Sequence, residues 1–387
     1  MKERVDDFFR LFCNLKRRLA PYRLKTDFET KKTVGVIDEL LNRAETLHAG
    51  AWPGGRYGVM TGHNVQNLIG RATKYLDALD AGELPLAGLF TEPGRCLVDH
   101  SFIEKDGVMH LFYNVGYIGY EWDSRFVDTF GHATSTDMIH WKVQPPVLNV
   151  SGAPYENHQI WAPGITEKDG TYYLYYAGVN EQVCQSICVA TSKDLFKFEK
   201  YAGNPVVTPG TWGLYDLNAW SDCRDPMPFW DDDGTLYLYY CTSIHHADGR
   251  TEPALGIASS TDMLHFTDRG AYTFDICDFC LESPFVLKRE DKYYLFYTNC
   301  GHGTAYAVSD NPIDGWKSLG MLIEREKNPV CAANVPSCAE VICFKNEWYI
   351  SCAERQPGCE QYLELFHCAW QDDGTLKIGE RVMLEGE

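Results

Sequence analysis

The chain has 387 residues, and its 45% of hydrophobic and 23% of charged residues are ordinary for a globular protein with a sizeable core. Acidic residues outnumber basic ones by 54 to 35, and the net charge of −19 argues against binding to nucleic acid or to an anionic membrane surface. A neutral, polyhydroxylated partner is compatible with this charge. No segment approaches the roughly 20 apolar residues of a membrane span.

Cysteine usage and the start of the chain both favour a cytoplasmic protein. The first residues, MKERVDDFFRLFCNLKRR, contain neither an uninterrupted apolar segment nor a small-residue cleavage site. The 15 cysteines are odd in number and scattered through strand-like segments, which favours reduced, buried thiols over a disulfide framework. Cys277 and Cys280 have CxxC spacing without a second pair, so we interpret them as packing residues or as incidental in spacing rather than as a metal or redox site.

Residues 1–90 have the apolar spacing of helices. One segment follows Phe8, Phe12, Leu15 and Leu19, and a second covers residues 37–47. A third begins at Asn64, a good N-cap, and stops at Gly82. This helical extension is a candidate for covering one face of the main domain or for assembly into a homo-oligomer, and the sequence leaves both open.

A repeated strand–turn–strand unit begins at about residue 95. Five such units occupy residues 96–113, 160–176, 223–240, 281–297 and 338–352. Their turns lie at Gly107, Gly170, Gly234, Asp291 and Asn346, with steps of 63, 64, 57 and 55 residues. Three of the turns are Asp-Gly pairs, at residues 106–107, 169–170 and 233–234, and such pairs suit the positive φ angles of a tight hairpin.

A second recurring element follows the hairpins. It reads GHATSTDMIHW at 131–141, CVATSKDLFKF at 188–198 and GIASSTDMLHF at 256–266, and it recurs more loosely at 306–316. It predicts a third strand, an Asp-containing turn and an outer strand. Four strands in each of five units predict an all-β fold, a five-bladed β-propeller over residues 91–387, with the helical segment of residues 1–90 before it. A β-sandwich, the main competitor, would not produce the same hairpin five times.

Three blades place a carboxylate near the start of their first strand. In a propeller these strands line the central axis, so their corresponding ends converge on one mouth of the channel. Asp99, Asp225 and Glu282 lie eight or nine positions before their hairpin turns, in segments that are otherwise apolar. A buried acid needs a partner or a function. Three acids at corresponding positions therefore indicate a catalytic site.

Glycosidic bond cleavage requires such a set of acids. One carboxylic acid protonates the leaving oxygen, and an ionised carboxylate activates water or attacks the anomeric carbon. Crowding carboxylates in a partly dry funnel separates their pKa values and so assigns these roles. Inverting and retaining mechanisms both remain open.

The order Asp, Asp, Glu in blades one, three and four resembles the furanosidase superfamily of five-bladed propellers, which includes glycoside hydrolase families 43 and 32. Trp161-Ala162-Pro163 followed by DGTYYLYY is similar to family 43, and Glu282-Ser283-Pro284 followed by KYYLFY is similar to both families. Arg224-Asp225-Pro226 and the pair HLFY (110–113) and GHATSTDMIHW are similar to family 32. The resemblance covers about residues 95–385.

The resemblance implies a role for each acid. Asp99 would be the base or nucleophile, Asp225 the pKa modulator or transition-state stabiliser, and Glu282 the general acid. Arg224 would bind a substrate hydroxyl with its fork of donors, or hold Asp225 in a salt bridge. Family 32 usually has Asn-Asp-Pro-Asn-Gly where this strand reads Val98-Asp99-His100-Ser101, and it usually adds a C-terminal β-sandwich, so family 43 is favoured.

Other residues near the mouth are candidates for binding substrate. Trp161, Trp220 and Trp122 are candidate platforms for a sugar ring, although a single Trp is more often a core residue. His100 is a candidate substrate contact or a structural histidine. His302 alone is insufficient evidence for a metal in the channel, so no metal ligand is assigned and no cofactor is expected to be required.

The sequence therefore predicts a glycosidase acting on small oligosaccharides. The resemblance implies a furanoside or pentoside substrate, such as an α-L-arabinofuranoside or a β-xyloside. A retaining β-fructofuranosidase-like enzyme is the first alternative, favoured by Arg224-Asp225-Pro226. A non-catalytic carbohydrate-binding propeller is the second, and a phosphorylase, which would need a basic phosphate pocket, is a third.

Overall fold

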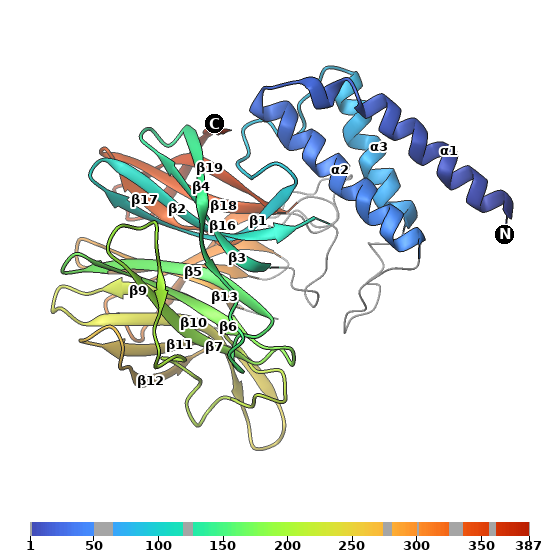
Figure 1. Cartoon of the computed structure of the whole chain (residues 1–387). Helices are drawn as coiled ribbons and strands as arrows, with labels where there is room; N and C mark the ends of the chain where they lie inside the picture. Colours follow the sequence, from blue (N-terminus) through green and yellow to red (C-terminus); the bar gives the residue numbers. More distant parts are fainter. Residues whose placement is uncertain are drawn as a thin grey trace.

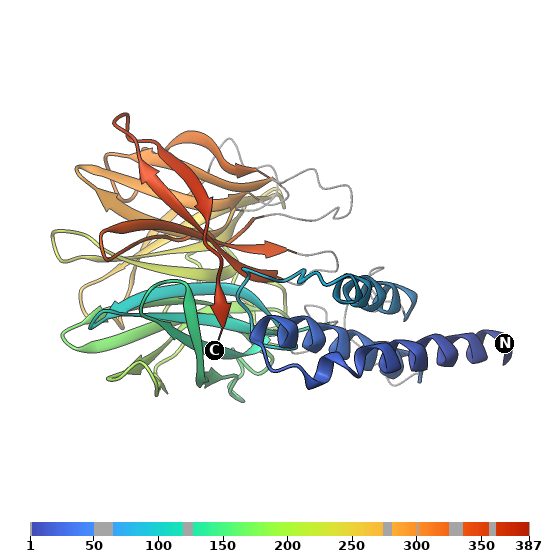
Figure 2. The ribbon, with the colours of Figure 1, turned by 90° about the horizontal axis from the view of Figure 1, so that it is seen from above.

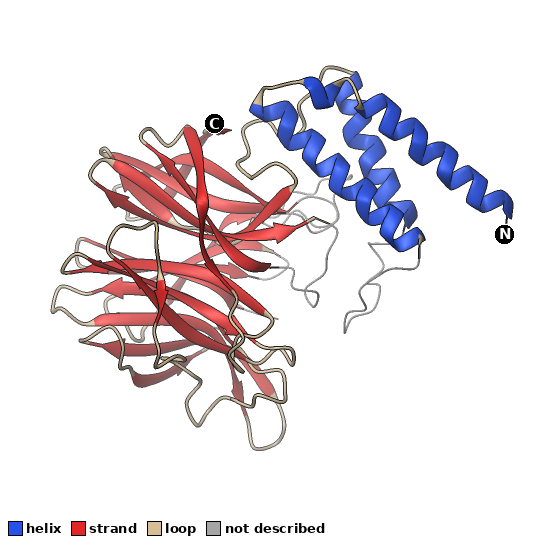
Figure 3. Ribbon diagram, viewed as in Figure 1, coloured by secondary structure: helices blue, strands red, loops and turns tan. Residues whose placement is uncertain are grey.

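The predicted five-bladed β-propeller with an N-terminal helical extension is confirmed by the computed structural model (Figures 1 and 3). The structure describes residues 2–49, 65–118, 127–273, 281–299, 302–324, 336–355 and 361–386. Cys277, Cys280, Asn64 and Trp122, which the sequence singled out, lie outside these ranges. Helices and strands are segregated, with the strands confined to the propeller (Figure 3).

Each blade is an antiparallel sheet whose strands follow one another in chain order from the axis outward. Blade 1 contains β1 (Arg95–Lys105), β2 (Val108–Tyr117), β3 (Val127–Ser135) and β4 (His140–Asn149), and blade 2 contains β5 (Gln159–Lys168), β6 (Thr171–Val179), β7 (Gln185–Ser192) and β8 (Glu199–Lys200). Blade 3 contains β9 (Cys223–Trp230), β10 (Leu236–His245), β11 (Thr251–Ser260) and β12 (Thr267–Tyr272). Blade 4 contains β13 (Leu281–Arg289), β14 (Lys292–Asn299), β15 (Gly303–Ser309) and β16 (Lys317–Glu324), and blade 5 contains β17 (Val341–Phe344), β18 (Glu347–Arg355), β19 (Gln361–Trp370) and β20 (Leu376–Arg381).

The tyrosine-rich second strands show why the units pack as blades. Tyr175 and Tyr176 are adjacent on β6 and point to opposite faces, yet both are fully buried. A strand between two neighbouring blades has both faces covered, so it is apolar and aromatic throughout rather than alternating. The hydroxyl groups still find partners, because Tyr175 donates to the Met263 carbonyl and Tyr176 to Glu156.

The hairpin turns confirm two of the three Asp-Gly predictions. Asp106 and Asp169 have positive φ angles of 54° and 50°, as do the glycines that follow them. In blade 3 only Gly234 has a positive φ, so the prediction for Asp233 was wrong. There Trp230 pairs with Leu236, and the longer connection closes with hydrogen bonds between Asp231 and Thr235 and between Gly234 and Asp231.

The recurring Ser-x-Asp element forms the predicted turn between third and fourth strands. The Ser135 hydroxyl accepts hydrogen bonds from the backbone N–H groups of Asp137 and Met138. The Asp137 carboxylate accepts hydrogen bonds from the backbone N–H groups of Ile139 and His140. The same pattern occurs at Ser192 and Ser260. Local side-chain bonds of this kind satisfy the turn without help from other blades.

Two connections close the ring between blades 5 and 1. Phe90, just before blade 1, pairs with Leu363 on β19. At the other end of the chain, β21 (Glu385–Gly386) pairs in parallel with β4 of blade 1. Segments from both ends of the propeller sequence therefore join blade 5 to blade 1.

The helical extension is a bundle on one side of the propeller. It comprises α1 (Lys2–Leu19), a 3₁₀ turn η1 (Tyr22–Leu24), α2 (Phe28–His48) and α3 (Val65–Asp80). Asp27 caps α2 by accepting a hydrogen bond from the Thr30 N–H at 2.8 Å. The N-terminal end of α1 points away from the propeller (Figures 1 and 2). Among the described residues, no helix has the length and apolar character needed to cross a membrane.

The bundle and the propeller share one hydrophobic cluster. Helical core residues such as Leu40 and Leu76 belong to the same buried cluster as Val98, Trp161 and Tyr362 of blades 1, 2 and 5. Val98 and Trp161 immediately precede the residues at which their strands reach the channel mouth. The bundle therefore packs beside the end of the propeller that the sequence predicts to be functional.

Lys32 fastens α2 to the segment that leads into blade 1. It is fully buried, its ammonium group donates to the carbonyls of Leu86 and Leu89, and it forms an ion pair with Glu29 at 2.9 Å. Burial lowers the pKa of Lys32, and the partner carboxylate opposes this shift.

We expect Lys32→Ala to destabilise the protein by about 3 kcal/mol, because it leaves Glu29 and two buried carbonyl groups without their donor. The neighbouring Lys31 is exposed, and Lys31→Ala should change the free energy of unfolding by less than about 0.5 kcal/mol. Urea denaturation followed by the helical circular dichroism signal would measure both. Equal changes in the free energy of unfolding for the two substitutions would contradict the proposed stabilising role of Lys32.

The innermost segments of the five blades enclose a channel that contains a cavity of about 150 Å³. Crowding at the axis is shown by Gly164, where a Cβ atom would lie 2.0 Å from the Pro226 carbonyl oxygen of the next blade. Glu340 of blade 5 lines the cavity and accepts a hydrogen bond from the Phe102 N–H of blade 1 at 3.1 Å. Burial raises the pKa of Glu340 to about 8.

The raised pKa of Glu340 makes stability depend on pH. Its ordinary pKa is 4.5, so the stabilisation by the protonated form is complete below that value and is lost as the pH rises toward 8. Glu340→Gln stays neutral throughout, and its Tm should therefore fall less than that of the wild type between pH 5 and pH 8. Thermal melts at both pH values would test this. The exposed Glu380→Gln on β20 should behave like the wild type.

Candidate active site

A β-bulge interrupts the innermost strands where they reach the mouth of the channel. The pairing of β5 with β6, of β9 with β10 and of β13 with β14 shifts register at this point. Ala162, Asp225, Ser283 and Cys338 have positive φ angles of 48° to 57° there. Proline follows the first three of them, and proline is tolerated in a strand where a bulge removes the need for its N–H group.

Neighbouring blades satisfy the backbone groups that each bulge releases. The Ala162 N–H donates to Asn114 of blade 1, and the Ser283 N–H donates to Asp225 of blade 3. The Cys338 N–H donates in the same way to the Thr298 hydroxyl of blade 4, at 2.9 Å. A polar side chain from the preceding blade thus holds each of these three bulges, because a buried N–H group requires an acceptor.

The bulges determine which side chains reach the channel. The residues that line it begin, blade by blade, at Asp99, Ala162, Asp225, Ser283 and Cys338. Asp99 and Asp225 therefore occupy corresponding positions, as predicted. Glu282 lies one residue before Ser283, at the place that Arg224 takes in blade 3, so the prediction that all three acids are equivalent was wrong by one residue. The predicted equivalence came from counting residues between each acid and its hairpin turn. Because the turn of blade 3 is longer, Asp225 and Glu282 gave the same count although their positions differ by one residue.

Asp225 is the most buried of the three acids, with only 8% of its surface exposed. Its Oδ2 atom accepts from the Ser283 N–H at 2.9 Å and lies 3.9 Å from the Arg224 Nε. Burial raises the pKa of Asp225 well above its ordinary value, Arg224 opposes this shift, and the charges of Asp99 and Glu282 add to it. The three acids therefore act on one another electrostatically, and a proton is retained in the group more readily than by an isolated Asp.

Glu282 forms an ion pair with Arg224, whose Nη2 lies 2.8 Å from the Glu282 Oε1. Arg224 also contacts Asp222 through Nη1 at 2.8 Å, so one guanidinium group bridges two carboxylates. Arg224 thus makes closer contacts with Glu282 and Asp222 than with Asp225. A general acid has to carry a proton, so the Arg224–Glu282 ion pair has to open before Glu282 can act as one.

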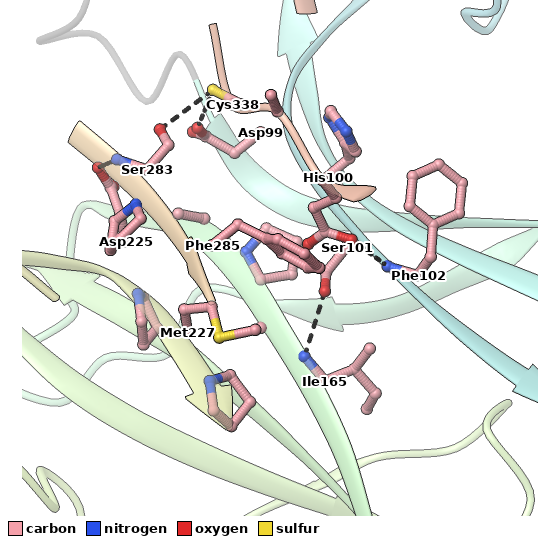
Figure 4. A pocket seen from close by; sticks show the side chains of 18 residues that line it. Asp99, His100, Ser101, Phe102, Ile165, Asp225, Met227, Ser283, Phe285 and Cys338 are labelled. Carbon is pink, nitrogen blue, oxygen red and sulfur yellow. Dashed lines mark hydrogen bonds between the residues drawn. The ribbon is translucent and has the colours of Figure 1, made fainter. Parts of the chain in front are cut away.

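Asp99 is half-buried on β1 and contacts blade 5 (Figure 4). Its Oδ1 atom accepts a hydrogen bond from the Cys338 thiol at 2.8 Å, and the Ser283 hydroxyl donates to the same sulfur atom at 3.2 Å. Neither Cys338 nor Ser283 was identified as a site residue from the sequence. The first strands of blades 2, 3 and 4 each contain a residue followed by proline (Ala-Pro, Asp-Pro and Ser-Pro), and these pairs were a sequence signal for the bulge. Alignment of blade 5 with these pairs would have placed Cys338 at the same position, beside the acids.

The predicted binding residues lie in different environments. His100 lines the channel, and its Nε2 lies 2.7 Å from the Ser351 hydroxyl of blade 5; burial lowers the pKa of this imidazole to about 3. Trp161 is buried and donates to Gln159. Trp220 is 44% exposed, and its indole N–H donates to Asp222, the partner of Arg224, at 2.9 Å. Trp122 lies outside the described residues.

His302 is the histidine considered from the sequence as a ligand for a metal in the channel. His302 is exposed just before β15, and its N–H donates to the Asn299 carbonyl. Within the described ranges, no group of three or more His, Cys, Asp or Glu side chains is arranged to hold a metal ion. A metal ligand therefore remains unassigned.

The sequence of the chain is similar to those of several glycosidases. The chain is 24% identical over 274 residues to a β-D-galactofuranosidase of Aspergillus niger, covering 66% of this chain and 70% of that protein. It is 26% identical over 317 residues to an arabinoxylan arabinofuranohydrolase of Paenibacillus polymyxa, covering 70% of this chain but 48% of the relative. A vacuolar acid β-fructofuranosidase of a rose cultivar is 33% identical over 130 residues, which cover 32% of this chain and 21% of that protein.

Solved structures support the fold. A β-xylosidase, RS223, has a TM-score of 0.58 at 18% identity, with 74% of this chain and 96% of that chain covered. A Bombyx mori β-fructofuranosidase of family 32 has a TM-score of 0.59 at 16% identity, with 75% and 64% covered. Residues 102–376, most of the propeller, match the model of the family described as glycosyl hydrolases family 43. The acids, the blades and this match together show that the chain belongs to glycosyl hydrolase family 43.

Proposed function

We propose that this family 43 enzyme hydrolyses a furanoside or pentoside in small oligosaccharides, of the α-L-arabinofuranoside or β-xyloside type. The observation that carries the proposal is the meeting of Asp99, Asp225 and Glu282 at one channel mouth, with Arg224 beside two of them. The relatives support the sugar class, because one is a β-D-galactofuranosidase and another is an arabinoxylan arabinofuranohydrolase.

The proposed mechanism divides the work between the acids. Glu282 donates a proton to the leaving glycosidic oxygen, and Asp99 takes a proton from the water that attacks the anomeric carbon. Asp225 interacts electrostatically with both acids and with Arg224, and its raised pKa keeps one negative charge out of the group more readily than an isolated Asp would. In a retaining variant of this mechanism, Asp99 would instead attack the anomeric carbon itself.

Arg224 is proposed to bind substrate and to release Glu282 in the same step. Its guanidinium group bridges Asp222 and Glu282. Two vicinal hydroxyl groups can replace a carboxylate as partners of the fork of donors. The exposed indole of Trp220, joined to the same Asp222, offers an apolar surface for the leaving part of the oligosaccharide.

A screen of aryl furanosides and pyranosides tests the substrate class. Turnover of α-L-arabinofuranosides or β-D-xylosides above all other substrates would support the proposal. The stereochemistry of the first product, followed by NMR, distinguishes the two roles of Asp99, since inversion requires a base and retention requires a nucleophile.

A β-fructofuranosidase-like activity is the second candidate. It is favoured by Arg224-Asp225-Pro226 and by the 33% identity over 130 residues to the rose β-fructofuranosidase. Hydrolysis of sucrose or a fructan with retention, together with inactivity toward pentosides, would establish it instead.

We expect Glu282→Gln and Asp99→Asn each to lower kcat by at least about 10²-fold, because acid and base catalysis typically contribute that much or more. Asp225→Asn should also lower kcat, because it removes a carboxyl group that interacts electrostatically with both of these acids. The amide oxygen of Asn can still accept the hydrogen bond from the Ser283 N–H group, so the Asp225→Asn variant should still fold. The loss in Glu282→Gln should be much smaller for a dinitrophenyl glycoside, whose leaving group needs no proton.

The exposed Asp291→Asn, at the far hairpin of blade 4, is the control and should retain full activity. Binding of sugar without turnover by the wild type would identify a non-catalytic carbohydrate-binding propeller. Turnover that requires inorganic phosphate would identify a phosphorylase.

We also propose that the protein self-associates through its helical extension. Phe9 and Leu11 of α1 are 47% and 44% exposed, on a helix whose N-terminal end extends away from the propeller (Figures 1 and 2). Burial of such side chains favours association. Sedimentation equilibrium should show a homo-oligomer that dissociates in a Phe9→Ser, Leu11→Ser variant, and a monomeric wild type would refute the proposal.

A cytoplasmic location is proposed from the thiols. The ten cysteines in the described part of the chain are free, and eight of them are buried. Free thiols are typical of reducing compartments. Fractionation of the source cells would test this location, and recovery of the protein outside the cell would exclude it.

A further inference from the structure

Two residues that carry no charge, Ser283 and Cys338, connect two of the three acids, Asp225 and Asp99. Ser283 and Cys338 take the corresponding bulge position in blades 4 and 5, with φ angles of 49° and 57°. The Ser283 N–H donates to Asp225, the Ser283 hydroxyl donates to the Cys338 sulfur, and the Cys338 thiol donates to Asp99 (Figure 4). A continuous chain of hydrogen bonds thus runs from blade 3 through blades 4 and 5 to blade 1.

We propose that Cys338 is a positioning residue whose thiol holds the Asp99 carboxylate in its working orientation. This inference rests on the proposed function, in which Asp99 is the base or nucleophile. The thiol binds Oδ1 from the side of blade 5, which restricts the rotation of the carboxyl group at the mouth of the channel. Preorganisation of this kind removes the need to reorient the carboxylate during the reaction.

The surroundings of Cys338 suit a donor that never loses its proton. The residue is 8% exposed, and its sulfur accepts one hydrogen bond while donating another. Burial raises the pKa of the Cys338 thiol well above its ordinary value, and the neighbouring Asp99 raises it further. An ionised carboxylate is only an acceptor, so a protonated thiol is complementary to it at every pH at which Asp99 works.

The bulge explains why a side chain as short as cysteine reaches Asp99. The backbone at Cys338 is held by the Thr298 hydroxyl of blade 4, which accepts its N–H at 2.9 Å. The positive φ angle at this position turns the side chain toward the axis, where it lines the channel together with Asp99 and Ser283. Packing alone would be satisfied by any small residue here, whereas the contact with Oδ1 requires a donor.

Cys338→Ala and Cys338→Ser separate positioning from packing. Cys338→Ala should lower kcat about tenfold with KM changed less than about twofold, because the lost bond to a charged group is worth roughly one pKa unit and Cys338 acts through Asp99. Cys338→Ser restores a donor and should recover most of the lost kcat. Cys188→Ala, a buried cysteine of blade 2, is the matched control and should retain wild-type kinetics.

The pH profile of kcat/KM is the second readout. Loss of a donor that favours the ionised carboxylate should move the acid limb of Cys338→Ala to higher pH by about one unit, and Cys338→Ser should move it back. The other charged and titratable groups at this mouth are Asp225 and Arg224 of blade 3, Glu282 of blade 4, Glu340 of blade 5 and His100 of blade 1. All of them are unchanged in these variants.

The outcomes distinguish this inference from the proposed function. If Asp99→Asn is inactive while Cys338→Ala keeps the wild-type kcat and pH profile, the positioning role is overturned and the function stands. If Asp99→Asn is fully active, both fail. Thermal melts show whether each variant folds; if Cys338→Ala does not, Cys338→Ser decides, and an activity as low as that of Asp99→Asn in a folded Cys338→Ser variant would overturn the role.

Discussion

The bulge at the mouth end of the innermost strands is the constraint on which the site depends. A regular strand would continue to pair with its neighbour and would alternate its side chains across the blade. The inserted residue breaks that alternation and directs successive side chains to the axis. It also releases backbone N–H groups, and a side chain from the preceding blade accepts each one at Ala162, Ser283 and Cys338.

Asp225 has a structural role as well as a place among the acids of the site, because it accepts the hydrogen bond from the Ser283 N–H group. Asn114 and Thr298 do the same work for blades 2 and 5 without an ionisable group. In blade 3 the acceptor is a carboxylate, placed within reach of Arg224 and in the field of two further acids. One side chain, Asp225, therefore joins blade 3 to blade 4 and also contributes to the electrostatics of the site. Because Asp225 holds Ser283, it also helps to position the adjacent Glu282 on β13.

The sequence predicts features that depend on local chemistry. The strand–turn units, the Asp106-Gly107 and Asp169-Gly170 hairpins and the Ser-x-Asp turns need only neighbours in the chain, and all were predicted correctly. Features that depend on the register between strands were missed. Glu282 is offset by one residue because a bulge and an unequal hairpin shift the count, and Cys338 contacts Asp99 across 239 residues of sequence, which no local pattern encodes.

The choice of a thiol beside Asp99 follows from what a charged residue would do in the same place. The field of a lysine would reach Asp225 and Glu282 as well, because charges interact over distances approaching the Debye length of about 8 Å. It would stabilise the ionised form of every acid in the group, including the proposed proton donor. A neutral donor acts only on the oxygen that it touches. Arg224 already supplies positive charge on the side of Glu282, so a short neutral group on the side of Asp99 allows the proposed base and the proposed acid to be tuned separately.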